Sequence, residues 1–131
     1  MKPIIERSKQ LDKIKIHISI FKLYKSYLVL ISDQESMGIG NVTLGIPPTI
    51  ENMKVSAATH QLFGVQQKIL SNIIVEKMSS YFNAPVLLLL FLKSINDDKE
   101  ISKPLILMLN EVLNDISKNG NLNDNFFEKK P

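Results

Sequence analysis

The sequence predicts an α+β domain, in which an antiparallel sheet of five to six strands carries two helices on one face in the order β-β-β-β-α-β-α. Three observations predict this class. Strand-like segments follow one another without an intervening helix in the first half of the chain. Two segments with helical spacing, 65–81 and 102–116, come later, and a stretch that is apolar at every position, 86–92, separates them. Consecutive strands without crossover helices favour antiparallel pairing.

The first two expected strands form a hairpin. Residues 1–11 are mixed and polar, and we expect them to form a loose N-terminal arm. From residue 14 to residue 20 isoleucine alternates with polar residues, a period of two that predicts a half-buried strand. Residues 26–31 are apolar on both faces, which predicts a central strand paired with the first.

Two shorter strands are expected next. Residues 41–46 have a strand-like composition and are closed by Pro47 and Pro48, which cannot continue a sheet ladder. Residues 55–62 are small, polar and weakly patterned, which is typical of an edge strand.

The pattern changes to helical spacing after Gly64. We expect a helix of four or five turns that ends at residues 83–85. Its predicted apolar stripe consists of Val65, Ile69, Leu70, Ile73, Ile74, Met78 and Tyr81. Residues 86–92 then predict a strand that is covered on both faces, because no position in it is polar.

A second helix is expected after an exposed acidic loop at 95–100. Ser102 is a suitable N-cap and Pro104 would lie in the first turn, where its missing N–H has little effect. The expected buried positions are Leu105, Met108, Leu109, Val112, Leu113 and Ile116. We therefore expect one α+β domain over 12–118, followed by a polar, disordered tail over 119–131.

The two doubly apolar strands carry a functional implication. Two helices can cover one face of a five-stranded sheet, but strands 27–31 and 86–92 are apolar on both faces. A large exposed apolar patch on a soluble chain usually marks a protein interface, so we expect a partner on the second face. The alternative is that residues 1–11 and the tail fold back over it.

The composition and the pattern of the first residues argue against several classes of protein. The chain has 131 residues, enough for one domain with its own core, and no cysteine, which excludes disulfides and cysteine nucleophiles. A net charge of +3 is too small to indicate nucleic acid or membrane binding. The first residues lack the apolar segment of a signal peptide, and the longest apolar run, 84–92, is far shorter than a spanning helix. We expect a soluble, intracellular protein without nucleic-acid or membrane partners.

No residue pattern predicts catalysis. His17 and His60 lie on separate expected strands without a second metal ligand nearby. Gly38 and Gly40 form a Gly-x-Gly that lacks the third glycine of a dinucleotide site, and a tight turn explains them better. Gly64 precedes a helix but lacks the other residues of a phosphate-binding loop.

Two groups of charged residues do not predict a binding site either. Asp97, Asp98 and Glu100 lack the glycine and the spaced ligand series of a cation-binding loop, so we interpret them as a solvated loop. Lysines on the first strand (Lys13, Lys15 and Lys22, with Phe21 nearby) form a solvated face rather than an RNA-binding stripe. The prediction is therefore that the chain has no catalytic, metal or cofactor residues and is not an enzyme. The alternative of a small enzyme would need a pocket with convergent polar groups around His17 or His60.

Several segments resemble the small proteasome assembly chaperones of the proteasome assembly chaperone 4 and 3 type. Ser26–Ile31 resembles the family's apolar second strand, and Ser56–Gly64 its small-residue strand ahead of the main helix. Asn83–Leu87 resembles the junction after that helix, and Ser102–Ile116 stands where the family has its last helix. The likeness covers residues 13–117. Lys15–Ile18 favours the chaperone 4 branch, although Ser32 and Asp33 stand where that branch tends to have glycine.

The resemblance implies a non-enzymatic function. Such proteins dimerise with a related small chaperone, bind α-type subunits of the 20S core particle and promote formation of the α-ring. The resemblance also implies a cytoplasmic location, with the nucleus as a second one. The alternative considered is a small α+β adaptor domain in a trafficking or GTPase-regulating complex, in which a helix usually comes earlier in the chain.

Overall fold

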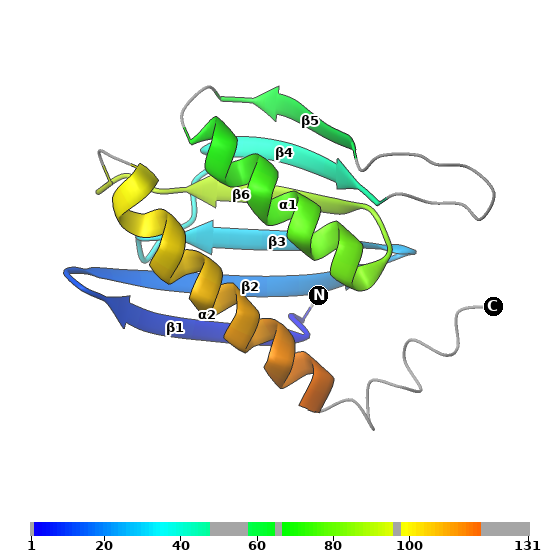
Figure 1. Cartoon of the computed structure of the whole chain (residues 1–131), viewed down its shortest axis with the longest axis horizontal. Coiled ribbons are helices and arrows are strands. Elements are labelled where there is room, and N and C mark those ends of the chain that lie inside the picture. Colours follow the sequence, from blue (N-terminus) through cyan, green and yellow to red (C-terminus); the bar gives the residue numbers. More distant parts are fainter. Residues whose placement is uncertain (1, 48–57, 65–66, 96–97, 119–131) are drawn as a thin grey trace.

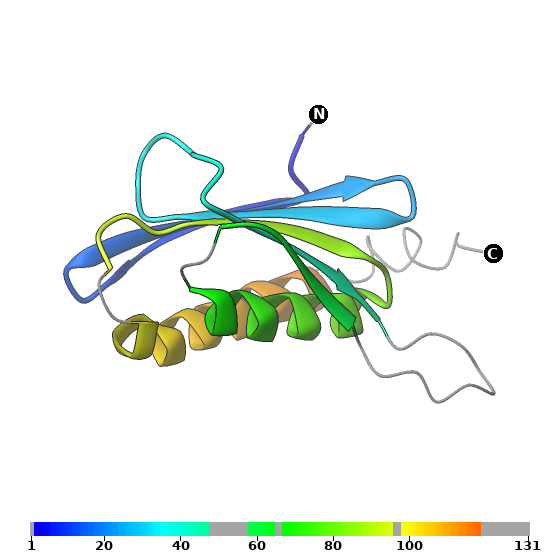
Figure 2. The same ribbon diagram turned by 90° about the horizontal axis from the view of Figure 1, so that it is seen from above.

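The computed structural model describes residues 2–47, 58–64, 67–95 and 98–118. A six-stranded sheet carries both helices on one face, which confirms the predicted α+β class (Figures 1 and 2). The strands are β1 (Ile5–Leu11), β2 (Ile14–Leu23), β3 (Ser26–Ser32), β4 (Asn41–Ile46), β5 (Ala58–Phe63) and β6 (Val86–Phe91). The helices are α1 (Lys68–Phe82) and α2 (Asp98–Lys118).

The strand order across the sheet is β1-β2-β3-β6-β4-β5. Neighbouring strands are antiparallel as predicted, except that β3 and β6 run parallel, with Tyr27 beside Val86 and Ile31 beside Leu90. The exception follows from the connection, because the β4–β5 hairpin and α1 lie between β3 and β6 in the chain. A crossover that contains a helix is the usual way to join parallel strands.

Strand β2, which was predicted from its alternating isoleucines, is confirmed. Ile16, Ile18 and Ile20 of β2 are fully buried beneath the helices. In β3 the buried positions are Val29 and Ile31, next to β2 in the antiparallel register. The core thus lies between the helices and this face of the sheet.

The expectation of a loose N-terminal arm was wrong, because Ile5–Leu11 forms β1. This strand pairs along its whole length with β2, from Ile5 opposite Ile20 to Leu11 opposite Ile14. Between Ile5 and Leu11, which join the core, its side chains are polar on both faces, and Arg7 and Lys9, which face the helices, form ion pairs with α2. Residues 5–11 therefore extend the sheet and do not fold over its second face.

The buried side of α1 differs from the predicted stripe. Ile69 is 73% exposed and Ile73 is 45% exposed, whereas Ser71, Val75 and Ser79 are buried. The reason lies in β4, where a Cβ added at Gly45 would stand 2.8 Å from the Cβ of Val75. Because glycine lets α1 approach the sheet closely, the small residues of α1 face inward. The helix also begins at Lys68, three residues later than predicted.

The start of α2 was also predicted wrongly. The helix begins at Asp98, so Ser102 is not its N-cap and Pro104 lies inside it. The predicted apolar side is confirmed, since Leu105, Leu109, Val112 and Ile116 are all buried. In β5 the described strand is Ala58–Phe63, and the earlier part of the expected strand falls outside the described residues. The expected tail over 119–131 also falls outside them.

Candidate interaction surface

The face of the sheet that points away from the helices is called the open face here. In β3, Val29 and Ile31 point toward the helices, so Leu28 and Leu30 lie on the open face and are half-buried. Strand β6 follows the same alternation and places Leu87 and Leu89 there. The prediction that these strands are apolar on both faces is therefore confirmed.

The strand register joins these residues into one apolar band. Leu28 and Leu30 lie beside Leu87 and Leu89 across the β3–β6 pair. Strand β4 extends the band on one side, and β2 extends it on the other. The further members of the band are Phe21, Val42, Leu44, Ile46 and Phe91.

Little of this band is covered by the described residues. Both helices lie on the opposite face, while the loop 33–40 and the N-terminal segment before β1 rise above parts of the open face (Figure 2). That loop packs closely on Phe91, since a Cβ at Gly38 would stand 2.6 Å from its ring. The Asp33 carboxylate accepts hydrogen bonds from the backbone N–H groups of Lys93 (2.9 Å) and Ser94 (2.7 Å), which fixes the base of the loop.

The open face is polar over β1 and the first half of β2. Glu6 and Ser8 of β1 lie opposite Ser19 and His17 of β2. The Ser8 Oγ is 2.7 Å from the His17 Nδ1, a hydrogen bond across the strand pair. Sequence reasoning missed this pair because it placed Ser8 in a loose arm. The strand register, in which Ser8 stands opposite His17, is the signal that would have found it.

The two histidines do not form a common site. His17 lies on β2 and His60 on β5, opposite Leu44, so three strands separate them. His60 is exposed. Over the residues that the structure describes, no group of three or more His, Cys, Asp or Glu side chains is arranged to hold a metal ion.

Two of the glycines that the sequence singled out, Gly40 and Gly64, have positive φ angles and lie just outside strands. Gly40 has a φ of 59° and approaches the carbonyl of Leu90 where the loop joins β4. Gly64 has a φ of 88° and follows β5, whereas α1 begins at Lys68 with Gln67 before it. Gly64 therefore does not open the helix, which removes the premise of an anion site at that glycine.

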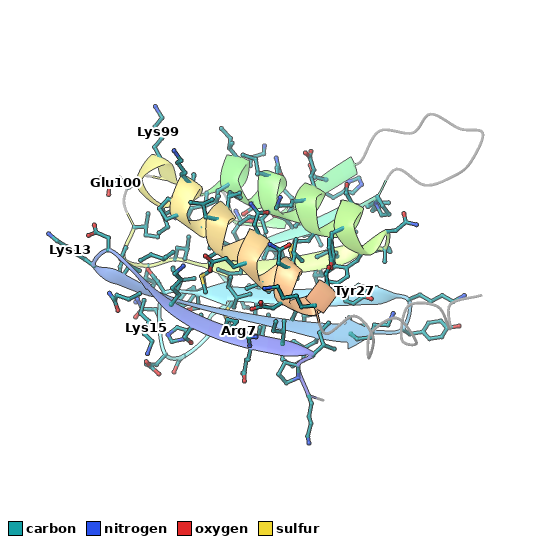
Figure 3. All side chains as sticks on the ribbon, turned by 60° about the horizontal axis from the view of Figure 1, so that its bottom comes forward. Arg7, Lys13, Lys15, Tyr27, Lys99 and Glu100 are labelled. Atoms are coloured by element: carbon teal, nitrogen blue, oxygen red, sulfur yellow. The ribbon has the colours of Figure 1, made fainter. Side chains whose placement is uncertain are left out.

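The charged residues singled out in the sequence are dispersed. Lys13 lies in the β1–β2 turn and Lys15 near the start of β2, whereas Lys99 and Glu100 extend from the start of α2 (Figure 3). Lys22 is on the helix side of β2, with its Nζ 4.7 Å from the centre of the Tyr27 ring, so it does not share a face with Lys15. Asp97 is outside the described residues, and the acidic segment runs into α2 rather than forming a loop.

The comparisons with known proteins bear on the fold. No protein-family model matches the sequence, and no curated protein matches it. The structure is similar to a chain in a solved structure described as the crystal structure of a novel chaperone complex for yeast 20S proteasome assembly, with a TM-score of 0.62 and 10% sequence identity. The match covers 87% of this chain and 94% of that chain. At this identity, the similarity shows a shared fold.

A further observation concerns membranes. Within the described ranges, none of the helices combines the length and the apolar character needed to cross a bilayer.

Proposed function

We propose that this protein is a non-enzymatic assembly chaperone for the 20S proteasome core particle. In this proposal it pairs with a related small chaperone, binds α-type subunits and promotes formation of the α-ring. The proposed location is the cytoplasm, with the nucleus as a second one. Neither nucleic acid nor membrane is a proposed partner.

The apolar band on the open face is the observation that carries the proposal. Leu28, Leu30, Leu87 and Leu89 form its centre, and the helices cover only the other side of the sheet. An apolar surface of this kind is typical of a face that docks against another protein. The polar strip over β1 and β2 would then be its rim, as in interfaces with an apolar centre and a polar edge.

The fold supports the proposed class of partner. The similar solved chain belongs to a chaperone complex for yeast 20S proteasome assembly, and the match extends over most of both chains. The segments that resemble the proteasome assembly chaperones, Ser26–Ile31 and Asn83–Leu87, form β3 and the junction into β6. These strands supply the centre of the apolar band.

The test is affinity purification of the tagged protein from its own cells, followed by mass spectrometry. Three forms are compared: the unchanged chain, Leu89→Glu on the open face and Leu107→Glu on α2. Leu107 is 54% exposed on the helix layer, so its variant adds the same charge on the other side of the molecule. Circular dichroism of each purified form checks that the fold is retained.

We expect the unchanged chain and the Leu107→Glu variant to recover α-type proteasome subunits together with one other small chaperone. The Leu89→Glu variant should lose the small chaperone. Recovery of neither partner by the unchanged chain, in mild salt, would contradict the proposal. Recovery of a trafficking or GTPase-regulating complex instead would favour the adaptor alternative.

A further inference from the structure

A cavity of about 360 Å³ opens on the polar end of the open face. Strands β1 and β2 form its floor, and the loop 33–40 forms a wall through Glu35 and Met37. Glu6 and Ser8 of β1 and His17 of β2 belong to this floor. The cavity thus adjoins the apolar band, and Leu30 belongs to both.

The polar atoms of the cavity are held by short-range contacts. Ser8 Oγ is hydrogen-bonded to His17 Nδ1 at 2.7 Å, and the Ser19 hydroxyl donates to Glu6 Oε2 at 3.5 Å. On the other side of the imidazole, His17 Nε2 is 4.0 Å from Glu35 Oε2, which is too long for a hydrogen bond. Of the two carboxylates, Glu35 approaches the histidine from the loop with a side chain that is 90% exposed, and Glu6 lies on β1 opposite Ser19.

The charge of the cavity runs against that of the chain. In the part of the chain that the structure describes, no lysine or arginine forms an ion pair with Glu6 or Glu35. Arg7 also lines the cavity, but its guanidinium donates to the Asp115 carboxylate (3.3 Å) and to the Glu6 backbone carbonyl (2.9 Å). The lining thus holds two carboxylates, Glu6 and Glu35, beside one guanidinium that is bonded elsewhere, in a protein of net charge +3.

The lining also has an apolar part, which narrows the class of ligand. Leu30 and Met37 can contact a hydrocarbon stem while the carboxylates contact a cationic head. Lysine and arginine side chains have this composition, since their methylene stems pack on apolar surface and their heads remain polar. A bare metal ion would use only the carboxylates.

We propose that this cavity binds the basic side chain, arginine or lysine, of the protein that docks on the open face. One part of this proposal, that the side chain belongs to a docked protein, rests on the proposed function. The other part, that the cavity recognises a cationic head on an aliphatic stem, depends only on the lining of the cavity.

The test therefore uses the free chain and a small probe. Nα-acetyl-arginine N-methylamide is titrated into the ¹⁵N-labelled protein, and the amide resonances of Ser8, His17, Ser19 and Met37 are followed by NMR. The matching citrulline compound has nearly the same shape without the charge. The variant Glu6→Gln/Glu35→Gln removes both carboxylates, and Glu76→Gln on the exposed side of α1 is the control variant.

We expect saturable shifts at the cavity with the arginine compound and no saturation with the citrulline compound. The double variant should bind about two- to fivefold more weakly, the scale of exposed ion pairs, while Glu76→Gln binds unchanged. Equal binding of both compounds, shifts spread over other exposed carboxylates, or unchanged binding by the double variant would each overturn the proposal. None of these outcomes depends on proteasome subunits, so the proposed function is judged separately by the purification experiment.

Discussion

Tyr27 lies fully buried between β3 and the end of α1 (Figure 3). Its ring stacks on Phe82 with a centroid distance of 3.9 Å. Burial, with a smaller contribution from the charge of Tyr81, raises the pKa of Tyr27 to about 12. An unfolded tyrosine has a pKa of about 10, so the folded chain holds this proton more tightly than the unfolded chain does.

The consequence is a loss of stability in alkali. Below about pH 10 the phenol is protonated in both states, and the free energy of unfolding does not depend on it. As the pH rises from about 10 to 12, the unfolded state loses the proton first and is favoured. Urea unfolding at a series of pH values should show this decline.

The comparison of two tyrosine variants isolates the effect. Tyr27→Phe should reduce the decline above pH 10, whereas Tyr24→Phe should keep it, because Tyr24 is 86% exposed at the β2–β3 turn. Equal pH dependence in the two variants would show that Tyr27 does not cause the decline.

Ser71 is a second residue whose environment predicts a measurable effect. It is fully buried in α1, and its Oγ has no hydrogen-bond partner among the described residues. A buried hydroxyl without a partner is unfavourable, and alanine has the higher helix propensity. Ser71→Ala should therefore raise the free energy of unfolding by about 1 kcal/mol.

The matched control is Ser79, which is also buried on α1 but whose Oγ donates to the Glu76 carbonyl at 3.4 Å. Urea unfolding of both variants is the measurement, and Ser79→Ala should stabilise the fold less than Ser71→Ala. A destabilised Ser71→Ala variant would mean that the Ser71 hydroxyl has a partner after all.

At the scale of elements, β1 is held to α2 by charge as well as by its pairing with β2. Arg7 and Asp115 are 3.3 Å apart, and Lys9 and Glu111 are 3.0 Å apart. These side chains are about half exposed, so each pair contributes little, at most about 1 kcal/mol, and salt screens it.

A charge swap tests this attachment. Lys9→Glu should lower the free energy of unfolding by about 1 kcal/mol in low salt, through repulsion between two glutamates. The swapped variant Lys9→Glu/Glu111→Lys should recover most of the loss. If 1 M salt left the difference between the single variant and the unchanged chain intact, electrostatics would not be its cause.

The ion pairs also explain which elements the sequence could predict. Strands β2, β3 and β6 follow from isoleucine alternation and from runs without a polar residue. Strand β1 does not, because Arg7 and Lys9 face the helices and form their ion pairs with α2, a contact far away in the chain. Local pattern cannot reveal a partner at that distance.

The same reasoning applies to α1 and to the candidate site. Ile69 looks like a core residue by its spacing, but the close approach at Gly45 turns Val75 inward instead. The apolar centre of the open face could be predicted, since residues 27–31 and 86–91 contain no charged or strongly polar position. The cavity could not, because Ser8 meets His17 only once β1 has formed.

At the scale of the whole molecule, the helices cover one face of the sheet and leave the open face uncovered by helices, and this difference predicts self-association. The open face presents an apolar band, and a second copy of the chain offers the same surface. Sedimentation of the purified chain should show an average mass that rises with concentration. Leu28→Glu should keep the chain monomeric, and Leu107→Glu should not.

A chain that stays monomeric at every concentration would contradict this expectation. It would favour the alternative in which the residues after 118 fold back over the open face. Deletion of those residues would then restore association.

The central position of β6 has a consequence for synthesis. This strand is made late, yet it joins the β1-β2-β3 unit to the β4–β5 hairpin. While the ribosome is still translating the earlier segments, the two units share no hydrogen-bonded edge, and the inner edges of β3 and β4 stay unpaired. Unpaired edges beside apolar surface are prone to aggregate. Emergence of residues 86–91 therefore gives both inner edges their partner in one step, although α2, which packs against β1, is made only afterwards.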